Sequence, residues 1–149
     1  MADVLLTLQA DAILEVADSQ LIPRGTLLPV AGTPFDFTHQ RAARVPELHR
    51  HVQLQHANGF DHCWVLNPAR TFDAELISPH SGITLRLSSS QPGLQFYGGQ
   101  WLARAHPGLN GLCLEPEQFP NAINEPRFPS PVLRPGEIGR VTISYQFAG

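Results

Sequence analysis

The sequence predicts an all-β protein, an antiparallel β-sandwich, and two observations carry this prediction. Short runs in which apolar and polar residues alternate recur along its 149 residues, and such alternation is typical of strands that bury one face. Fourteen prolines and twelve glycines interrupt the chain too often for long helices. We therefore expect a single domain, residues 1–149, of short strands joined by turns, with no helix longer than about three turns.

Three runs show the alternation most clearly, and each predicts a strand. The first lies at residues 4–9, the second at 83–88 and the third at 140–147. In the third run, four apolar residues occupy every second position and share one face: Val141, Ile143, Tyr145 and Phe147. We expect each of these strands to bury its apolar face.

Turn signals separate the runs, and only one segment suggests a helix. Pairs and triplets rich in Pro, Gly and Asn, which favour tight turns, lie at residues 23–25, 58–59, 79–82, 92–93, 98–99 and 135–136. The helix candidate runs from Gln40 to Gln53, where Pro46 interrupts it.

The charge pattern argues against a nucleic-acid-binding protein. The formal net charge is −3, and no basic cluster is larger than those at 41–44 and 49–51, whereas nucleic acid binding needs clustered Lys and Arg. No apolar run approaches the ~20 residues of a membrane-spanning helix, and the N-terminus lacks the pattern of a secretory signal. We expect a cytoplasmic protein without a nucleic-acid or membrane partner.

The two cysteines predict neither a disulfide framework nor a metal site. Cys63 and Cys113 each lie in an apolar, strand-like run, which favours reduced, packed thiols. His62 adjoins Cys63, but neighbours on a strand point to opposite faces. We therefore expect no metal at this pair, and a position for His62 in or next to the core.

Glu115 is the most prominent candidate for chemistry. The apolar run Leu112 to Leu114 leads directly to it, and Pro116 fixes the backbone just beyond it. A carboxylate held in one place is suited to proton transfer. The alternative is a proline-rich loop that carries a solvated glutamate.

Four blocks of sequence, in order along the chain, support the chemical interpretation. They are Gly-Thr-Pro-Phe-Asp-Phe at 32–37, Gly-Phe-Asp-His at 59–62, Gln-Pro-Gly-Leu-Gln-Phe-Tyr at 91–97, and the stretch from Leu114 to Glu137. Together they resemble the C-terminal half of the aldose 1-epimerases, also called galactose mutarotases. The resemblance implies a galactose mutarotase-like fold, here a partial supersandwich.

The resemblance also implies an activity and a site. Members of this family interconvert the α and β anomers of a free hexose such as galactose or glucose by acid–base ring opening, without a cofactor. By resemblance Glu115 is the catalytic base, and Asp61 and Gln95 hydrogen-bond the sugar. Tyr97 is a lighter candidate for stacking on the sugar's apolar face. If these matches hold, the side chains of Asp61, Gln95 and Glu115 should converge on one concave surface.

The chain departs from the family pattern in ways that leave alternatives open. Glu117 stands where the family usually has Gln, and Asn121 where it has Asp; an extra carboxylate facing the same pocket would raise the proton affinity of Glu115. The family's catalytic histidines belong to an N-terminal half that nothing here matches. We therefore expect pairing with such a half or self-association, and weak activity alone unless His62 or His106 substitutes as the acid. The alternatives are a non-catalytic carbohydrate-binding module and an inert remnant.

Overall fold

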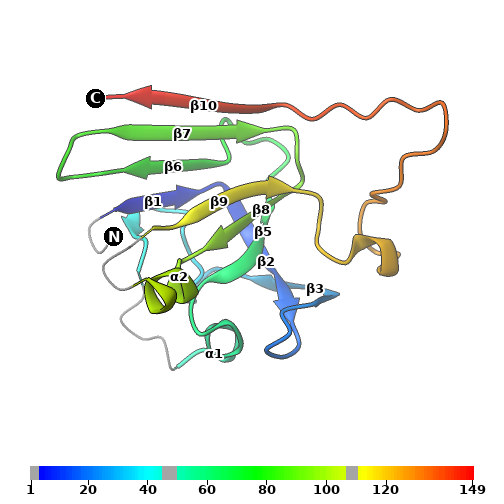
Figure 1. The fold of residues 1–149 in the computed structure, drawn as a ribbon, viewed down its shortest axis with the longest axis horizontal. Coiled ribbons are helices and arrows are strands. Elements are labelled where there is room, and N and C mark those ends of the chain that lie inside the picture. Colours follow the sequence, from blue (N-terminus) through cyan, green and yellow to red (C-terminus); the bar gives the residue numbers. More distant parts are fainter. Residues whose placement is uncertain (1–3, 45–49, 107–110) are drawn as a thin grey trace.

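A computed structural model describes residues 4–44, 50–106 and 111–149, and two five-stranded antiparallel sheets form most of it (Figure 1). Sheet A has the order β10-β7-β6-β1-β4, with β1 Leu5–Leu8, β4 Arg41–Ala42, β6 Ala74–Ile77, β7 Thr84–Ser89 and β10 Ile143–Ala148. Sheet B has the order β3-β2-β5-β8-β9, with β2 Ala10–Val16, β3 Pro23–Pro29, β5 Asp61–Leu66, β8 Gly93–Tyr97 and β9 Cys113–Glu117. The predicted antiparallel β-sandwich is confirmed.

The two sheets pack through a core rich in aromatic rings. Trp64 of β5 is fully buried at its centre, and its indole Nε1 donates a hydrogen bond of 3.1 Å to the carbonyl of Phe35. Phe60 and Phe96 stack with ring centroids 4.9 Å apart. Sheet A contributes aliphatic side chains to the same cluster, among them Leu6, Leu8 and Leu87. Because side chains alternate along β5, the residues between those that face this core lie on the outer face of sheet B.

Strand β10 extends sheet A beyond the cover of sheet B. Its residues Ile143, Tyr145 and Phe147 are 42%, 55% and 72% exposed, so the prediction that this strand buries its apolar face is wrong. The strand pairs with β7 at the edge of sheet A, after a long connection from β9 (Figure 1). In register, Tyr145 lies opposite Leu87, which is buried in the core, but no other described element covers the apolar face of β10.

The helices are short, and their positions differ from the prediction. Residues 41–42 form β4 instead of a helix, residues 45–49 lie outside the described part, and α1 spans only Val52–Ala57. A second helix, α2 at Gln100–Ala105, was not predicted, nor was the 3-10 turn η1 at Ala122–Asn124. Both α-helices have six residues, which confirms the predicted upper limit for the described residues. Within the described ranges, no helix is long and apolar enough to cross a membrane.

Helix α1 is attached to β2 through one buried side chain. The amide of Gln53 accepts a hydrogen bond from the backbone N–H of Val16 at 2.9 Å and donates one to its carbonyl at 2.8 Å. The helix ends at Asn58, which adopts the left-handed conformation (φ 52°) that Asn tolerates better than most residues. Gln53 thus satisfies both backbone polar groups of Val16.

Replacing Gln53 by Met should lower the free energy of unfolding by about 1–3 kcal/mol, because it leaves buried backbone groups of Val16 without hydrogen bonds. Urea denaturation followed by tryptophan fluorescence measures the change. Gln20→Met, in an exposed turn, is the matched control and should change stability by less than about 0.5 kcal/mol. Equal effects of the two substitutions would contradict the assigned role of Gln53.

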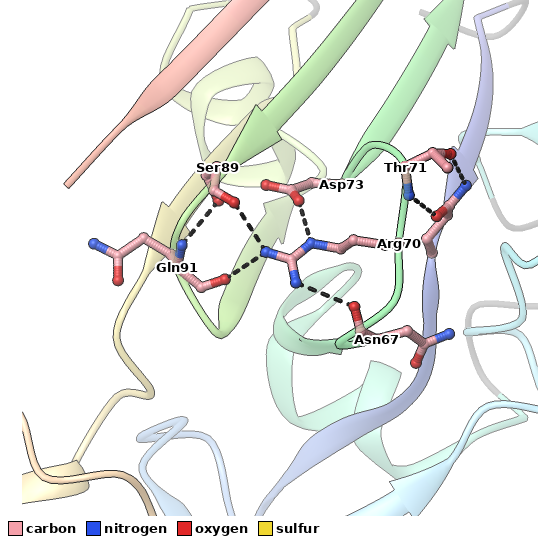
Figure 2. A network of polar contacts seen from close by, with 7 residues as sticks. Asn67, Arg70, Thr71, Asp73, Ser89 and Gln91 are labelled. Atoms are coloured by element: carbon pink, nitrogen blue, oxygen red, sulfur yellow. Dashed lines mark hydrogen bonds and ion pairs between the residues drawn. The ribbon is translucent and has the colours of Figure 1, made fainter.

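A largely buried arginine, Arg70, joins the connections between the two sheets (Figure 2). The guanidinium of Arg70 forms an ion pair with Asp73 and donates to the carbonyls of Asn67 (3.1 Å), Ser89 (3.0 Å) and Gln91 (2.8 Å). The side chain of Asp73 is 1% exposed and that of Arg70 is 14% exposed. This network ties the loop from β5 to β6 to the residues that connect β7 with β8.

The outermost strands of sheet B carry prolines. Strand β9 includes Pro116, which lies opposite Leu94 of β8, and β3 begins at Pro23 and ends at Pro29. Proline has no backbone N–H, so it is tolerated in a strand only where that donor is not needed for the ladder, as at a sheet edge. The edge position of β9 therefore accommodates the proline that follows Glu115.

Candidate functional site

The register of three neighbouring strands builds the site on the outer face of sheet B. Strand β8 lies between β5 and β9, and its pairing aligns their side chains in rows. The rows, in strand order β5, β8 and β9, are Asp61–Tyr97–Cys113, Cys63–Gln95–Glu115 and Val65–Gly93–Glu117. Because side chains alternate along each strand, all of these residues share the face away from the core.

This face forms an open pocket of about 390 Å³. Its lining residues come from all three rows and from neighbouring strands, loops and helix α2: Val16, Leu21, Pro23, Asp61, His62, Cys63, Gln95, Tyr97, Trp101, Glu115, Glu117 and Pro120. The four site residues predicted from the sequence, Asp61, Gln95, Tyr97 and Glu115, therefore line one pocket. A pocket of this size, with convergent polar groups, suits a small polar ligand.

The polar groups of the pocket differ in how firmly they are held. The amide of Gln95 donates a 2.7 Å hydrogen bond to Oδ1 of Asp61, so these two side chains form one preorganised unit. Glu115 is exposed at the rim. Tyr97 contributes its ring, while its hydroxyl oxygen accepts hydrogen bonds from the backbone N–H groups of Trp101 (3.0 Å) and Leu102 (3.3 Å) at the start of α2.

Glu117 is a pocket residue that sequence reasoning did not include in the site. Burial, followed by the charges of Glu115 and Asp61, raises the pKa of Glu117 to about 7, while a hydrogen bond with the Cys63 thiol acts in the opposite direction. Its Oε1 is buried and has no hydrogen-bond partner among the described residues. The sequence signal was available, because residues two apart on a strand share a face. By itself, this shared face predicts only a perturbation of Glu115.

The segment that follows β9 folds back and shields one side of this pocket. Phe119 and Phe128 pack edge to face with ring centroids 5.1 Å apart, in a small cluster with Leu14 and Cys63. Gly93 leaves the room for them, because an added Cβ would lie only 2.7 Å from Sγ of Cys63 and 3.1 Å from the ring of Phe119. This apolar cluster excludes water from one side of the Glu117 carboxyl.

Asn121 has a structural role in the same segment. It adopts a positive φ of 63°, which Asn tolerates better than most residues. Its side-chain amide donates a 2.9 Å hydrogen bond to the carbonyl of Pro23. The departure from the family pattern at this position therefore fastens the shielding segment to β3.

The two cysteines and His62 separate into core and surface positions. Cys63 is buried and Cys113 is exposed, and both are free, so the expectation of two packed thiols holds only for Cys63. His62 is buried beside the ring of Phe35, and Nδ1 accepts a 3.2 Å hydrogen bond from the backbone N–H of Asp61. Burial lowers the pKa of His62 to about 3, so this side chain is neutral near pH 7 and unsuited to proton donation.

In the described part of the chain, no group of three or more potential ligands could hold a metal ion.

Two packed antiparallel sheets with a carboxylate-lined pocket define a galactose epimerase-like β-sandwich. A crystal structure of galactose 1-epimerase from Lactobacillus acidophilus matches with a TM-score of 0.82 and 25% identity, over 99% of this chain and 44% of that chain. An aldose epimerase homologue from C. elegans shares the fold with a TM-score of 0.77 and 24% identity, over 99% of this chain and 46% of that chain.

Sequence comparison narrows this class to one family. The profile of the aldose 1-epimerases matches residues 1–146, and the chain belongs to this family. It is 40% identical to galactose mutarotase from Homo sapiens, over 96% of this chain and 43% of that protein, and 33% identical to aldose 1-epimerase from Escherichia coli, over 95% and 44%. The chain therefore spans less than half the length of these relatives.

Proposed function

We propose that this chain carries the base and part of the sugar-binding pocket of an aldose 1-epimerase, which interconverts the α and β anomers of a free hexose such as galactose or glucose. The observation that carries the proposal is the convergence of Asp61, Gln95 and Glu115 in one pocket of a family member. Relatives named galactose mutarotase favour galactose as a substrate.

In this mechanism Glu115 starts ring opening. Its carboxylate removes the proton from the C1 hydroxyl, the electron pair of that O–H bond forms the C1 carbonyl, and the bond from C1 to the ring oxygen breaks as that oxygen takes up a proton. Rotation about C1–C2 then presents the other carbonyl face, and the steps reverse to close the ring. Glu115 lies at an open rim, where a hexose can present C1 without displacing the protein.

Asp61 and Gln95 orient the sugar for this step. A carboxylate can accept hydrogen bonds from neighbouring hydroxyls, and an amide both donates and accepts. The hydrogen bond between the two side chains fixes both before the sugar arrives, which lowers the entropic cost of binding. Tyr97 offers a ring held in place by α2, against which an apolar sugar face can pack.

A non-catalytic carbohydrate-binding module is the alternative, and the Asp61–Gln95 unit favours it because sugar binding there does not require Glu115 to react. The two functions differ in what Glu115→Gln should do. A binding module keeps its affinity and has no rate to lose, whereas an epimerase keeps affinity and loses rate.

We also propose that the exposed apolar face of β10 is where the N-terminal half of an aldose 1-epimerase packs. The support is that this face is uncovered and that the matched relatives are more than twice as long as the matched segment. Self-association through the same face is the competing outcome, and sedimentation velocity of the chain alone would reveal it as a dimer.

The free cysteines fit a cytoplasmic location, which we propose for this chain.

Two-dimensional NMR exchange spectroscopy of galactose and glucose tests the proposed function. The wild-type chain should speed exchange between the anomer signals above the buffer rate, and adding a separately expressed N-terminal half from a relative should speed it further. Chemical shift changes at Asp61 and Gln95 should report sugar binding. Binding without any catalysed exchange, with and without the added half, would favour the binding module and contradict the epimerase.

A further inference from the structure

The pocket holds a carboxyl group that the mechanism above does not use. Glu117 lies on the same face of β9 as Glu115, two residues away, and both line the pocket with Asp61. At about 3.3 Å of rise per strand residue, the two glutamates are separated by about 7 Å along the strand. A hexose ring that presents its C1 hydroxyl to one can therefore present its ring oxygen to the other.

The surroundings of Glu117 favour a proton-bearing carboxyl. The other titratable groups that line the pocket are Asp61, His62 and Cys63 from β5, Tyr97 from β8 and Glu115 from β9. The neighbouring side chains from β2, β3 and the loop between them are apolar, and no arginine is among the described residues that line the pocket. Carboxylates that share a site without a cation cannot all ionise easily, so the most buried retains a proton.

The hydrogen bonding of Glu117 is incomplete. Its Oε1 is buried without a partner among the described residues, and a buried polar atom without a partner is costly. The Cys63 thiol is in contact with the carboxyl, but it is a weak donor. A protonated carboxyl meets this shortage of donors in part, and because Glu117 lines the pocket, a sugar oxygen there can accept its proton.

We propose that Glu117 is the general acid of this site and delivers a proton to the ring oxygen of the sugar. This inference rests on the proposed function and identifies a second catalytic residue for it. Glu115 takes the C1 hydroxyl proton while the Glu117 O–H gives its proton to the ring oxygen, whose bond to C1 breaks. On ring closure, Glu117 takes the proton back from the C5 hydroxyl, and Glu115 returns its proton to the C1 oxygen. Both carboxyl groups end in their starting states, and no other reactant is needed.

The pH dependence of catalysis follows from the raised pKa of Glu117, about 7. Below this value the acid carries its proton, and above it the proton is lost. Exchange catalysed by the wild-type chain should therefore decline as the pH rises through about 7. The neutral, buried His62 cannot produce this decline, because it bears no proton to lose in that range.

The test compares Glu117→Gln with the wild-type chain by NMR exchange spectroscopy over about two pH units on either side of neutrality. Gln keeps the shape and the hydrogen-bonding capacity but cannot act as an acid. We expect the exchange rate of the variant to be at least about 10²-fold lower than that of the wild type. Sugar binding should be unchanged, and the decline of the rate with rising pH should be lost. Glu137→Gln, an exposed glutamate outside the pocket, is the control and should match the wild type.

A second readout needs no catalysis. With ¹³C-labelled glutamate, the side-chain carboxyl signal that disappears in Glu117→Gln should titrate near pH 7. Titration of that signal below pH 5, about the range of an ordinary Glu, would overturn the proposal. The proposal would also be overturned if the wild type and Glu117→Gln were equally active while Glu115→Gln was inactive. That outcome would leave the proposed function intact. A wild-type chain that catalyses no exchange, with or without the added N-terminal half, would reject the proposed function and this inference with it.

Discussion

The Glu115→Gln variant should interconvert hexose anomers about 10²–10⁴-fold more slowly than the wild-type chain, because Gln cannot accept the proton of the C1 hydroxyl. Glu115 lies opposite Gln95 across the pair of β8 and β9, and its side chain is exposed at the pocket rim. The substitution therefore removes a base without disturbing packing. NMR exchange spectroscopy of galactose, with the uncatalysed rate subtracted, measures the loss.

Sugar binding and stability are the controls for this result. Affinity for galactose should change little, since Asp61 and Gln95 keep their mutual hydrogen bond, and the midpoint of urea denaturation should stay within error. Retention of the full wild-type rate would show that Glu115 is not the base. An unfolded variant would instead contradict the view that this side chain makes no packing contribution.

Replacing Arg70 by Met should lower the free energy of unfolding by about 3–5 kcal/mol, because it leaves the carboxylate of Asp73 buried without its cation. Oδ1 of Asp73 accepts a hydrogen bond from Nε of Arg70 (Figure 2). Oδ2 has no hydrogen-bond partner among the described residues, so the carboxylate relies on Arg70. The substitution also removes the donors to three backbone carbonyls that connect the sheets. Urea denaturation at neutral pH measures the loss.

Two further variants distinguish the cost of burying an unpaired charge from the cost of losing the arginine side chain. The double variant Arg70→Met/Asp73→Asn removes both charges and should be more stable than Arg70→Met alone. Arg86→Met breaks an ion pair with Glu75 whose arginine is 56% exposed, and it should cost only about 0–1 kcal/mol. If Arg70→Met and Arg86→Met were equally mild, the buried network would contribute little to stability.

The alternation of residues predicted the strands and the faces that they share, but not what covers those faces. The runs at 4–9 and 83–88 correspond to β1 and β7, and the C-terminal run to β10. The apolar residues of β10 do share one face, yet Tyr145 and Phe147 are exposed. A period of two is a local property of the chain, whereas burial depends on which other strand lies opposite.

The candidate site was predictable where it follows from strand geometry. Asp61, Gln95 and Glu115 share a face because each lies at the matching phase of its strand, and this could be inferred from the sequence blocks. The shared face of Glu117 could be inferred in the same way, but its burial could not, since that depends on the fold-back of Phe119 and on the missing side chain of Gly93. These are contacts between segments that no local pattern encodes. The helix α2, too short for a clear period, was missed for a similar reason.

The prolines of sheet B restrict how this protein can recruit further β-structure. A strand that docks on the outer edge of β9 meets Pro116, and one that docks on β3 meets Pro23 and Pro29; each lacks a donor for the new ladder. On sheet A, β4 is only two residues long, whereas β10 offers six residues without a proline. Growth by strand addition is therefore directed to β10, and sheet B keeps its width. A strand added at β10 extends sheet A and leaves the pocket on the outer face of sheet B open.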